Sequence, residues 1–206
     1  MHIYSIEEGT QLVKAARNAI ELYIKNPHFD KKHIQESLRN FADYYGVFVT
    51  LEYYPLNTLR GCIGYPNAVG PIKNSLVEAA IGAAFEDPRF NPLSIKELDD
   101  ITVEVSILSK PEELPKDYKK RIESIKIGRD GLIVEFGFYS GLLLPIVPVE
   151  EKWDKEKFFQ ETCIKAGLPE GYWRRADVKL FKFETQIFKE EEPNGKIKEI
   201  KLEEGL

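Results

Sequence analysis

The sequence predicts an α+β fold, with largely antiparallel sheets and flanking helices. Segments typical of strands come in pairs joined by short loops, and segments of helical periodicity stand between these pairs. The chain has 206 residues, of which 43% are hydrophobic, and this is enough for a sizeable core. We therefore expect residues 1–206 to form a single domain.

The chain opens with a predicted helix. Ser5 and Glu8 have the spacing of a capping box, in which each side chain bonds the other's backbone N–H. Apolar residues then recur at helical spacing until Asn26-Pro27 ends the helix. Residues 30–41 carry a weaker helical pattern.

Two strands and a helix follow. Residues 46–51 are rich in β-forming side chains, and residues 57–66, which read NTLRGCIGYP, form the expected second strand. Pro71 is expected to begin a helix. This helix is rich in small residues, which allow another backbone to approach it closely. Residues 86–92 then form a loop with two prolines and charges of both signs.

The second half begins with a strand at 101–108, in which apolar and polar residues alternate. Residues 122–149 have the pattern of a β-meander, with turns predicted at Asp130-Gly131 and Ser140-Gly141.

The C-terminal part is predicted to contain one helix and a hairpin. Asp154 caps the helix and Gly167 ends it. A strand at 178–188 then turns at residues 193–195 into a last strand at 196–202.

Composition excludes several classes of protein. A net charge of −5 argues against nucleic-acid binding, and no apolar run is long enough to span a membrane. No secretory signal is seen at the start, so we expect a cytoplasmic protein with two free cysteines. Neither the cysteines nor the histidines have metal-ligand spacing, and no GxxxxGK phosphate loop is present, so we expect no metal and no cofactor. A charged fraction of 31% with a single Met hints at a heat-adapted source.

Five short motifs in a fixed order give the chain a resemblance to the AMMECR family. The resemblance extends roughly from Glu7 to Phe188. The motifs are LRGCIG at 59–64, FEDPRF at 85–90, VEVSIL at 103–108, GLLLP at 141–145 and CIKAGL at 163–168.

The resemblance implies a free-standing archaeal or bacterial member of that family. It implies an α+β fold in two unequal lobes, with the RGCIG segment near the cleft between them. The family has no settled activity, and in microbes it looks functionally tied to a Memo-like protein and a radical S-adenosylmethionine protein. The fold and a place for the site thus follow from the resemblance, and the chemistry does not.

Cys62 is the first candidate for chemistry. Arg60 lies two positions earlier on the same strand face, and a nearby cation favours the thiolate. Gly61 and Gly64 leave room for a substrate to approach the backbone. The alternative is that Cys62 is a small packing residue, which is how we interpret Cys163 on its apolar helical stripe.

The loop at 86–92 and the strand at 101–108 supply the other candidates. Arg89 offers a planar fork suited to a carboxylate or phosphate, with Asp87 beside it. The alternative is a turn in which Arg89 pairs with Asp87 or Glu104 and fixes the loop. Glu104 and Ser106 share the polar face of their strand, where Glu104 is the best candidate general base if that face lines a cleft. Otherwise both are ordinary surface residues.

Two functions remain open. In the first, an enzyme binds a small anionic substrate with Arg60 and Arg89, Cys62 attacks or undergoes redox chemistry, and Glu104 moves protons. In the second, the same cleft binds a metabolite or a partner protein without catalysis. We predict that Cys62, Arg89 and Glu104 surround one concavity, and that Cys62 is the more reactive thiol because Arg60 stabilises its thiolate.

Overall fold

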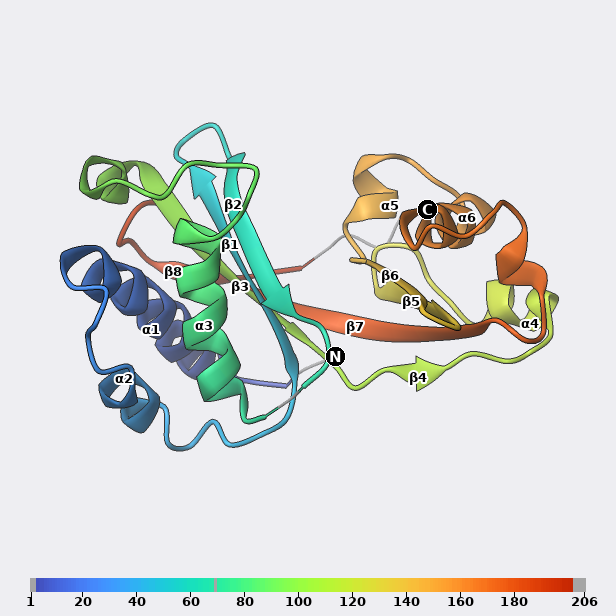
Figure 1. Cartoon of the computed structure of the whole chain (residues 1–206), viewed down its shortest axis with the longest axis horizontal. Helices are drawn as coiled ribbons and strands as arrows, with labels where there is room; N and C mark the ends of the chain where they lie inside the picture. The colour runs from blue at the N-terminus through green and yellow to red at the C-terminus, as the bar shows by residue number, and fades with distance from the viewer. Residues whose placement is uncertain (1–2, 69, 202–206) are drawn as a thin grey trace. The chain divides into compact units, whose positions relative to one another are not determined.

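The computed structural model describes residues 3–68 and 70–201, and the chain divides into two compact units (Figure 1). The first unit is Met1–Leu108 with Gln186–Ile200, and the second is Ser109–Thr185 with Lys201–Leu206. The cleft expected between two lobes stays a prediction.

The first and third helices begin and end close to where the sequence places them, but the second covers only Lys32–Ser37 of the predicted residues 30–41. The capping box at Ser5 and Glu8 is formed, and Asn26 caps the C-terminal end of the first helix. Pro71 is the N-terminal cap of the third helix, one position before the helical residue that we expected it to be. The elements are α1 (Ile6–Lys25), α2 (Lys32–Ser37), α3 (Ile72–Phe85) and the 3₁₀ helix η1 (Ile95–Asp100).

Antiparallel strands form the sheet of the first unit. Its order is β2-β1-β3-β7, with β8 paired to β7, and β2 is the edge strand. Residues 186–190 of β7 belong to this unit. The strands are β1 (Gly46–Tyr53), β2 (Thr58–Tyr65), β3 (Ile101–Leu108), β7 (Lys179–Glu190) and β8 (Ile197–Ile200).

The core of the first unit lies on one face of this sheet, under α1 and α3 (Figure 1). Alternate residues of β1 and β3 point into it and are fully buried: Val47, Val49, Leu51, Val103, Val105 and Ile107. The alternation predicted for residues 101–108 is therefore confirmed, and the residues between these positions point to the opposite face of the sheet.

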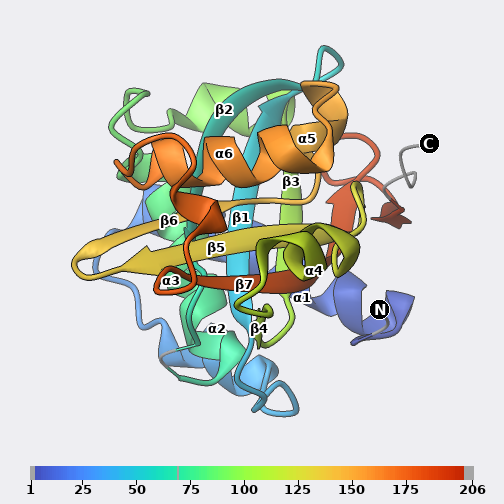
Figure 2. The ribbon, with the colours of Figure 1, turned by 90° about the vertical axis from the view of Figure 1, so that its right-hand side faces the viewer.

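In the second unit, strands β6, β5 and β7 lie side by side, as Figure 2 shows, and β4 also pairs with β7. As predicted, Asp154 caps α6 and Gly167 follows it with a φ of +79°. Cys163 is fully buried in α6, which confirms its packing role. The elements are β4 (Glu112–Glu113), α4 (Tyr118–Glu123), β5 (Asp130–Phe136), β6 (Tyr139–Leu143), α5 (Val147–Glu150), α6 (Lys155–Lys165) and the 3₁₀ helix η2 (Tyr172–Arg174).

The two turns predicted within residues 122–149 are wrong. Asp130-Gly131 begins β5 and Ser140-Gly141 lies inside β6. The chain turns instead at Gly137, whose φ is +59°, and at the fully exposed Phe138. The Asp130 side chain is buried, and its carboxylate accepts hydrogen bonds from the backbone N–H of Lys126 and from the Arg129 guanidinium. These bonds fix the start of β5.

The turn predicted at residues 193–195 is confirmed, because it joins β7 to β8. Residue 202 of the last predicted strand lies outside the described residues. Among the described residues, no helix combines the length and the apolar character needed to cross a lipid bilayer.

Helix α3 packs against β2 at Gly61. A Cβ built at this residue lies 2.1 Å from the carbonyl oxygen of Ala83, which is too close for any real contact. The Gly61→Ala substitution is expected to push α3 from the sheet and to lower the free energy of unfolding by about 1–3 kcal/mol, the usual cost of overpacking.

The measurement is urea denaturation of both Gly61→Ala and Gly70→Ala. Gly70 is the matched control, since a Cβ there meets nothing within 4 Å. Equal stability of the two variants would contradict the proposed packing of α3 on β2.

Candidate functional site

A β-bulge in β2 decides which of its side chains face the core. Glu52 of β1 lies opposite Leu59, but the next residue, Leu51, lies opposite Gly61, so Arg60 is an extra residue in β2. Beyond the bulge, Cys62 lies opposite Thr50. The bulge thus sets the register of the RGCIG segment.

Three polar side chains form a row across neighbouring strands. Thr50 of β1 lies opposite Cys62 on one side and opposite Glu104 of β3 on the other. Directly opposed residues of antiparallel strands point to the same face, and here it is the face turned away from α1 and α3. The Thr50 hydroxyl donates to the Cys62 Sγ at 3.4 Å. We call Cys62, Thr50 and Glu104 the polar row.

The loop at 86–92 is tied to β2 by Asp87. Its buried carboxylate accepts the backbone N–H of Cys62 at 2.8 Å, which satisfies an outward N–H of an edge strand. The same carboxylate accepts the Nε of Arg89 at 3.0 Å and its Nη2 at 2.7 Å. The hydrogen bonds from the Arg89 guanidinium hold the pKa of Asp87 well below its usual range, although burial of the carboxylate acts in the opposite direction. The pairing of Arg89 with Asp87, which was the structural alternative, is confirmed.

Arg89 is the exposed cation of the site. Its side chain keeps 54% of its surface exposed although two of its nitrogens are bound to Asp87. Within residues 3–68 and 70–201, the Nη1 of Arg89 has no hydrogen-bond partner. Its charge acts on the Cys62 thiol, so the guanidinium lies close to the polar row.

Ser106 extends the polar row along β3. The Ser106 hydroxyl, which is buried, donates to Glu104 Oε1 at 3.4 Å. The structure thus brings together Cys62, Asp87, Arg89, Glu104 and Ser106, all of which were predicted as site residues. Whether they surround one concavity stays a prediction.

Burial is the main cause that shifts the pKa of the Cys62 thiol. It raises the pKa of this half-buried thiol, and the charges of Glu104 and Asp87 raise it further. The Thr50 hydrogen bond and the Arg89 charge act the other way without outweighing burial. The balance of these effects favours the thiol over the thiolate. Burial also raises the pKa of Cys163, to about 11.

The role predicted for Arg60 is wrong. Its side chain is only 4% exposed and donates to Glu97 Oε1 at 2.8 Å and to the carbonyl of Asn91 at 2.9 Å. This hydrogen bond from Arg60 is the main cause that lowers the pKa of Glu97 to about 2. Arg60 is not among the main causes that shift the pKa of Cys62, because the bulge breaks the strand alternation on which that prediction rested. Arg60 therefore braces the strand and is too buried to anchor a ligand.

Two of the predicted substrate contacts, Gly61 and Gly64, are glycines because neighbouring groups fill the space of a side chain. The backbone of α3 fills the side-chain position of Gly61, and the ring of Phe48 fills that of Gly64, 2.3 Å from the built Cβ. Gly61 faces the helices, so a molecule on the opposite face of the sheet does not meet it.

Thr50 is the site residue that sequence reasoning missed. The alternation of β1 puts Thr50 on the polar face, but its neighbours across the sheet depend on a bulge that carries no sequence signature. In the part of the chain that the structure describes, no three His, Cys, Asp or Glu side chains are grouped so as to hold a metal ion.

The hydrogen bond from Thr50 predicts the reactivity of Cys62. Thr50→Val removes a donor that favours the thiolate, so the pH midpoint for alkylation of Cys62 is expected to rise, whereas Thr50→Ser keeps the hydroxyl and the midpoint. Iodoacetamide labelling over a pH series, followed by peptide mapping, measures both. The same midpoint in the valine and serine variants would exclude a role for the hydroxyl.

Charge substitutions at the site are expected to act in opposite directions. Glu104→Gln removes a charge that raises the pKa of Cys62, so labelling at fixed pH accelerates, and Arg89→Met slows it. Cys163 is fully buried and is expected to react only after unfolding. Labelling of Cys163 before Cys62 in native protein contradicts this order.

Comparisons with known proteins place the chain among archaeal relatives. Protein MJ0810 of Methanocaldococcus jannaschii is 50% identical over 207 residues, which cover 98% of this chain and all of that protein. Protein PH0010 of Pyrococcus horikoshii is 48% identical over 93% of this chain and 94% of that protein.

A solved structure has the same fold. The crystal structure of the uncharacterised protein PH0010 superimposes with a TM-score of 0.89 at 46% identity, and it covers 98% of this chain and 100% of that one. The α+β prediction is thereby confirmed. Residues 13–188 match the AMMECR1 family, and the chain therefore belongs to that family.

Proposed function

We propose that the protein is an enzyme that acts on a small anionic molecule at the polar row, with Cys62 as nucleophile and Glu104 as general base. The observation that carries this proposal is the line of Cys62, Thr50 and Glu104 across three strands, with a fixed arginine beside it. We place this activity in the cytoplasm, in keeping with two free thiols.

Arg89 is suited to hold the anion. Asp87 engages the Nε and Nη2 of the guanidinium, so the group is fixed before a ligand arrives, and Nη1 remains available. A carboxylate or phosphate is the group that a planar guanidinium recognises best. Asp87 itself is fully used by Cys62 and Arg89, and so positions the anion site without touching the ligand.

Glu104 is suited to take the proton of Cys62. The pKa of the thiol is raised above its ordinary value, so formation of a nucleophilic thiolate requires a base. Glu104 acts electrostatically on Cys62, and the Thr50 side chain stands between them in the row. The Thr50 hydroxyl donates to Cys62 Sγ, so the proposed transfer requires it to turn, accept the proton of the thiol and pass its own to Glu104. Asp87 is a poorer base because its carboxylate already accepts four hydrogen bonds.

The raised pKa of Cys62 favours a second candidate, a binding module without catalysis. Arg89, Glu104 and Ser106 then recognise a metabolite or a peptide of a partner protein. A Memo-like and a radical S-adenosylmethionine protein are the partners that the family resemblance suggests.

Turnover separates the two candidates. The protein is incubated with small carboxylates and phosphates, and loss of substrate is followed by mass spectrometry. We expect Cys62→Ser to abolish product formation and Arg89→Met to weaken substrate binding about tenfold or more, the cost of a charged hydrogen bond. Arg39→Met is the matched control, because Arg39 is an exposed arginine outside the site.

Two results count against the enzyme. Unchanged turnover in Cys62→Ser removes the thiol from the mechanism. A compound that binds wild type and not Arg89→Met, and is recovered unaltered, supports the binding module.

A further inference from the structure

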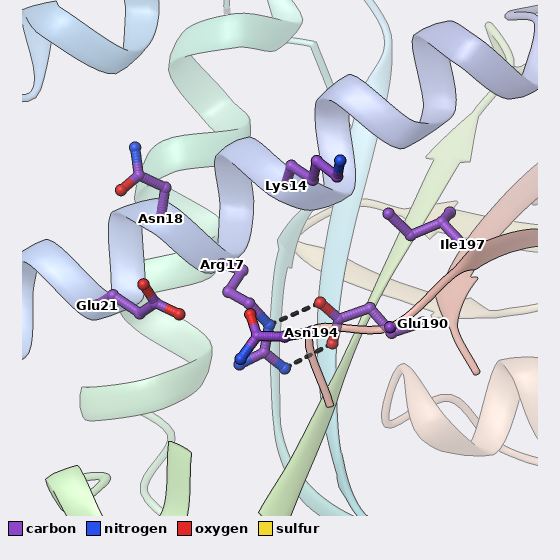
Figure 3. Close-up of a pocket in the computed structure, with 8 residues that line it drawn as sticks. Lys14, Arg17, Asn18, Glu21, Glu190, Asn194 and Ile197 are labelled. Carbon is purple, nitrogen blue, oxygen red and sulfur yellow. Dashed lines mark hydrogen bonds and ion pairs between the residues drawn. The ribbon is translucent and has the colours of Figure 1, made fainter. Parts of the chain in front are cut away.

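A hollow in the first unit lies between α1 and the hairpin that joins β7 to β8 (Figure 3). Its volume is about 190 Å³, several times the ~30 Å³ that one water molecule takes in the liquid. This is below the ~300 Å³ at which pockets for drug-sized ligands begin, so the hollow suits a small molecule. We call it the α1 hollow.

A buried ion pair forms the floor of the α1 hollow. Arg17 of α1 donates from Nε and Nη2 to the two carboxylate oxygens of Glu190, at 2.6 and 2.5 Å (Figure 3). Arg17 also donates to the carbonyls of Leu98 and Ile101, and Glu190 accepts the backbone N–H of Val103. Because both side chains are bound on several sides, the floor is rigid and electrically neutral.

Four further polar side chains line the hollow. Lys14, Asn18 and Glu21 follow one another at intervals of four and three residues, so they lie on one stripe of α1, and Asn194 comes from the hairpin turn (Figure 3). In the part of the chain that the structure describes, no side-chain hydrogen bond or ion pair engages any of the four. Their donors and acceptors are free for a ligand.

The charges of the lining sum to zero but are separated in space. Lys14 and Arg17 are positive, Glu21 and Glu190 are negative, and the buried pair cancels itself. A free cation and a free anion remain at opposite ends, with Cα atoms about 10 Å apart along the helix. The long stems of Lys14 and Glu21 allow their charged ends to close on a molecule shorter than this span.

We propose that the α1 hollow binds a small zwitterion of the amino-acid kind. The carboxylate of the ligand faces Lys14, and its ammonium group faces Glu21. The amides of Asn18 and Asn194 hydrogen-bond to whichever polar groups remain. A polyanion such as a nucleotide is disfavoured, because it meets Glu21 and a floor that carries no net charge.

Binding is tested by titrating ¹⁵N-labelled protein with L-alanine, L-glutamate and L-lysine, with propionate and ethylamine as probes that carry one charge only. We expect at least one of the amino acids to cause saturable shift changes in the amides of residues 14–21 and 190–195. Propionate and ethylamine are expected to bind about tenfold more weakly or worse, since each leaves one charge of the hollow unpaired.

Variants locate the contacts. Lys14→Met and Glu21→Gln are each expected to weaken binding of that amino acid about tenfold. Lys25→Met, on the same helix outside the hollow, is expected to leave binding unchanged. Absence of saturable shifts with all three amino acids, or equal weakening by Lys14→Met and Lys25→Met, overturns the proposal.

Discussion

The β-bulge at Arg60 determines which side chains of β2 face the helices and which face the polar side of the sheet. If the pairing of Glu52 with Leu59 continued without the extra residue, Cys62 would lie opposite Val49 and point into the core, and Gly61 would lie on the polar face. With the bulge, Gly61 faces the helices and Cys62 lies on the polar face. Gly61 then admits the backbone of α3, and Cys62 joins Thr50 and Glu104. Helix packing and the polar row thus depend on the same residue.

Buried charges hold this arrangement in place. Arg60 connects the bulge to Glu97 of η1 and to the carbonyl of Asn91, and Asp87 connects the neighbouring loop to Cys62. Each is almost fully buried, where an unpaired charge is costly and a paired one specifies geometry. Arg89 differs, because Asp87 fixes it while half of its surface stays exposed. The exposed cation of the site is therefore positioned by a carboxylate that is not itself available to a ligand.

Local patterns in the sequence predicted what depends on local physics. The capping box at Ser5, the alternation of β3 and the pairing of Asp87 with Arg89 all involve residues within a few positions of one another. The bulge involves strand pairing, and one added residue in β2 changed the partners of both Arg60 and Cys62. The turn predicted at Asp130 failed for a related reason, since that carboxylate is committed to Lys126 and Arg129 at the start of a strand.

The electrostatics of the polar row constrain the order of any reaction there. Arg89 favours the Cys62 thiolate, but burial, Glu104 and Asp87 together raise the pKa of the thiol. An anion bound to the free edge of Arg89 offsets part of the charge that favours the thiolate, so bound substrate and thiolate compete for one guanidinium. The thiolate is then least stable when the substrate is in place. In the enzyme that we propose, proton transfer from Cys62 to Glu104 therefore accompanies the attack on the substrate, because a thiolate formed beforehand would lose its stabilising cation as the anion binds.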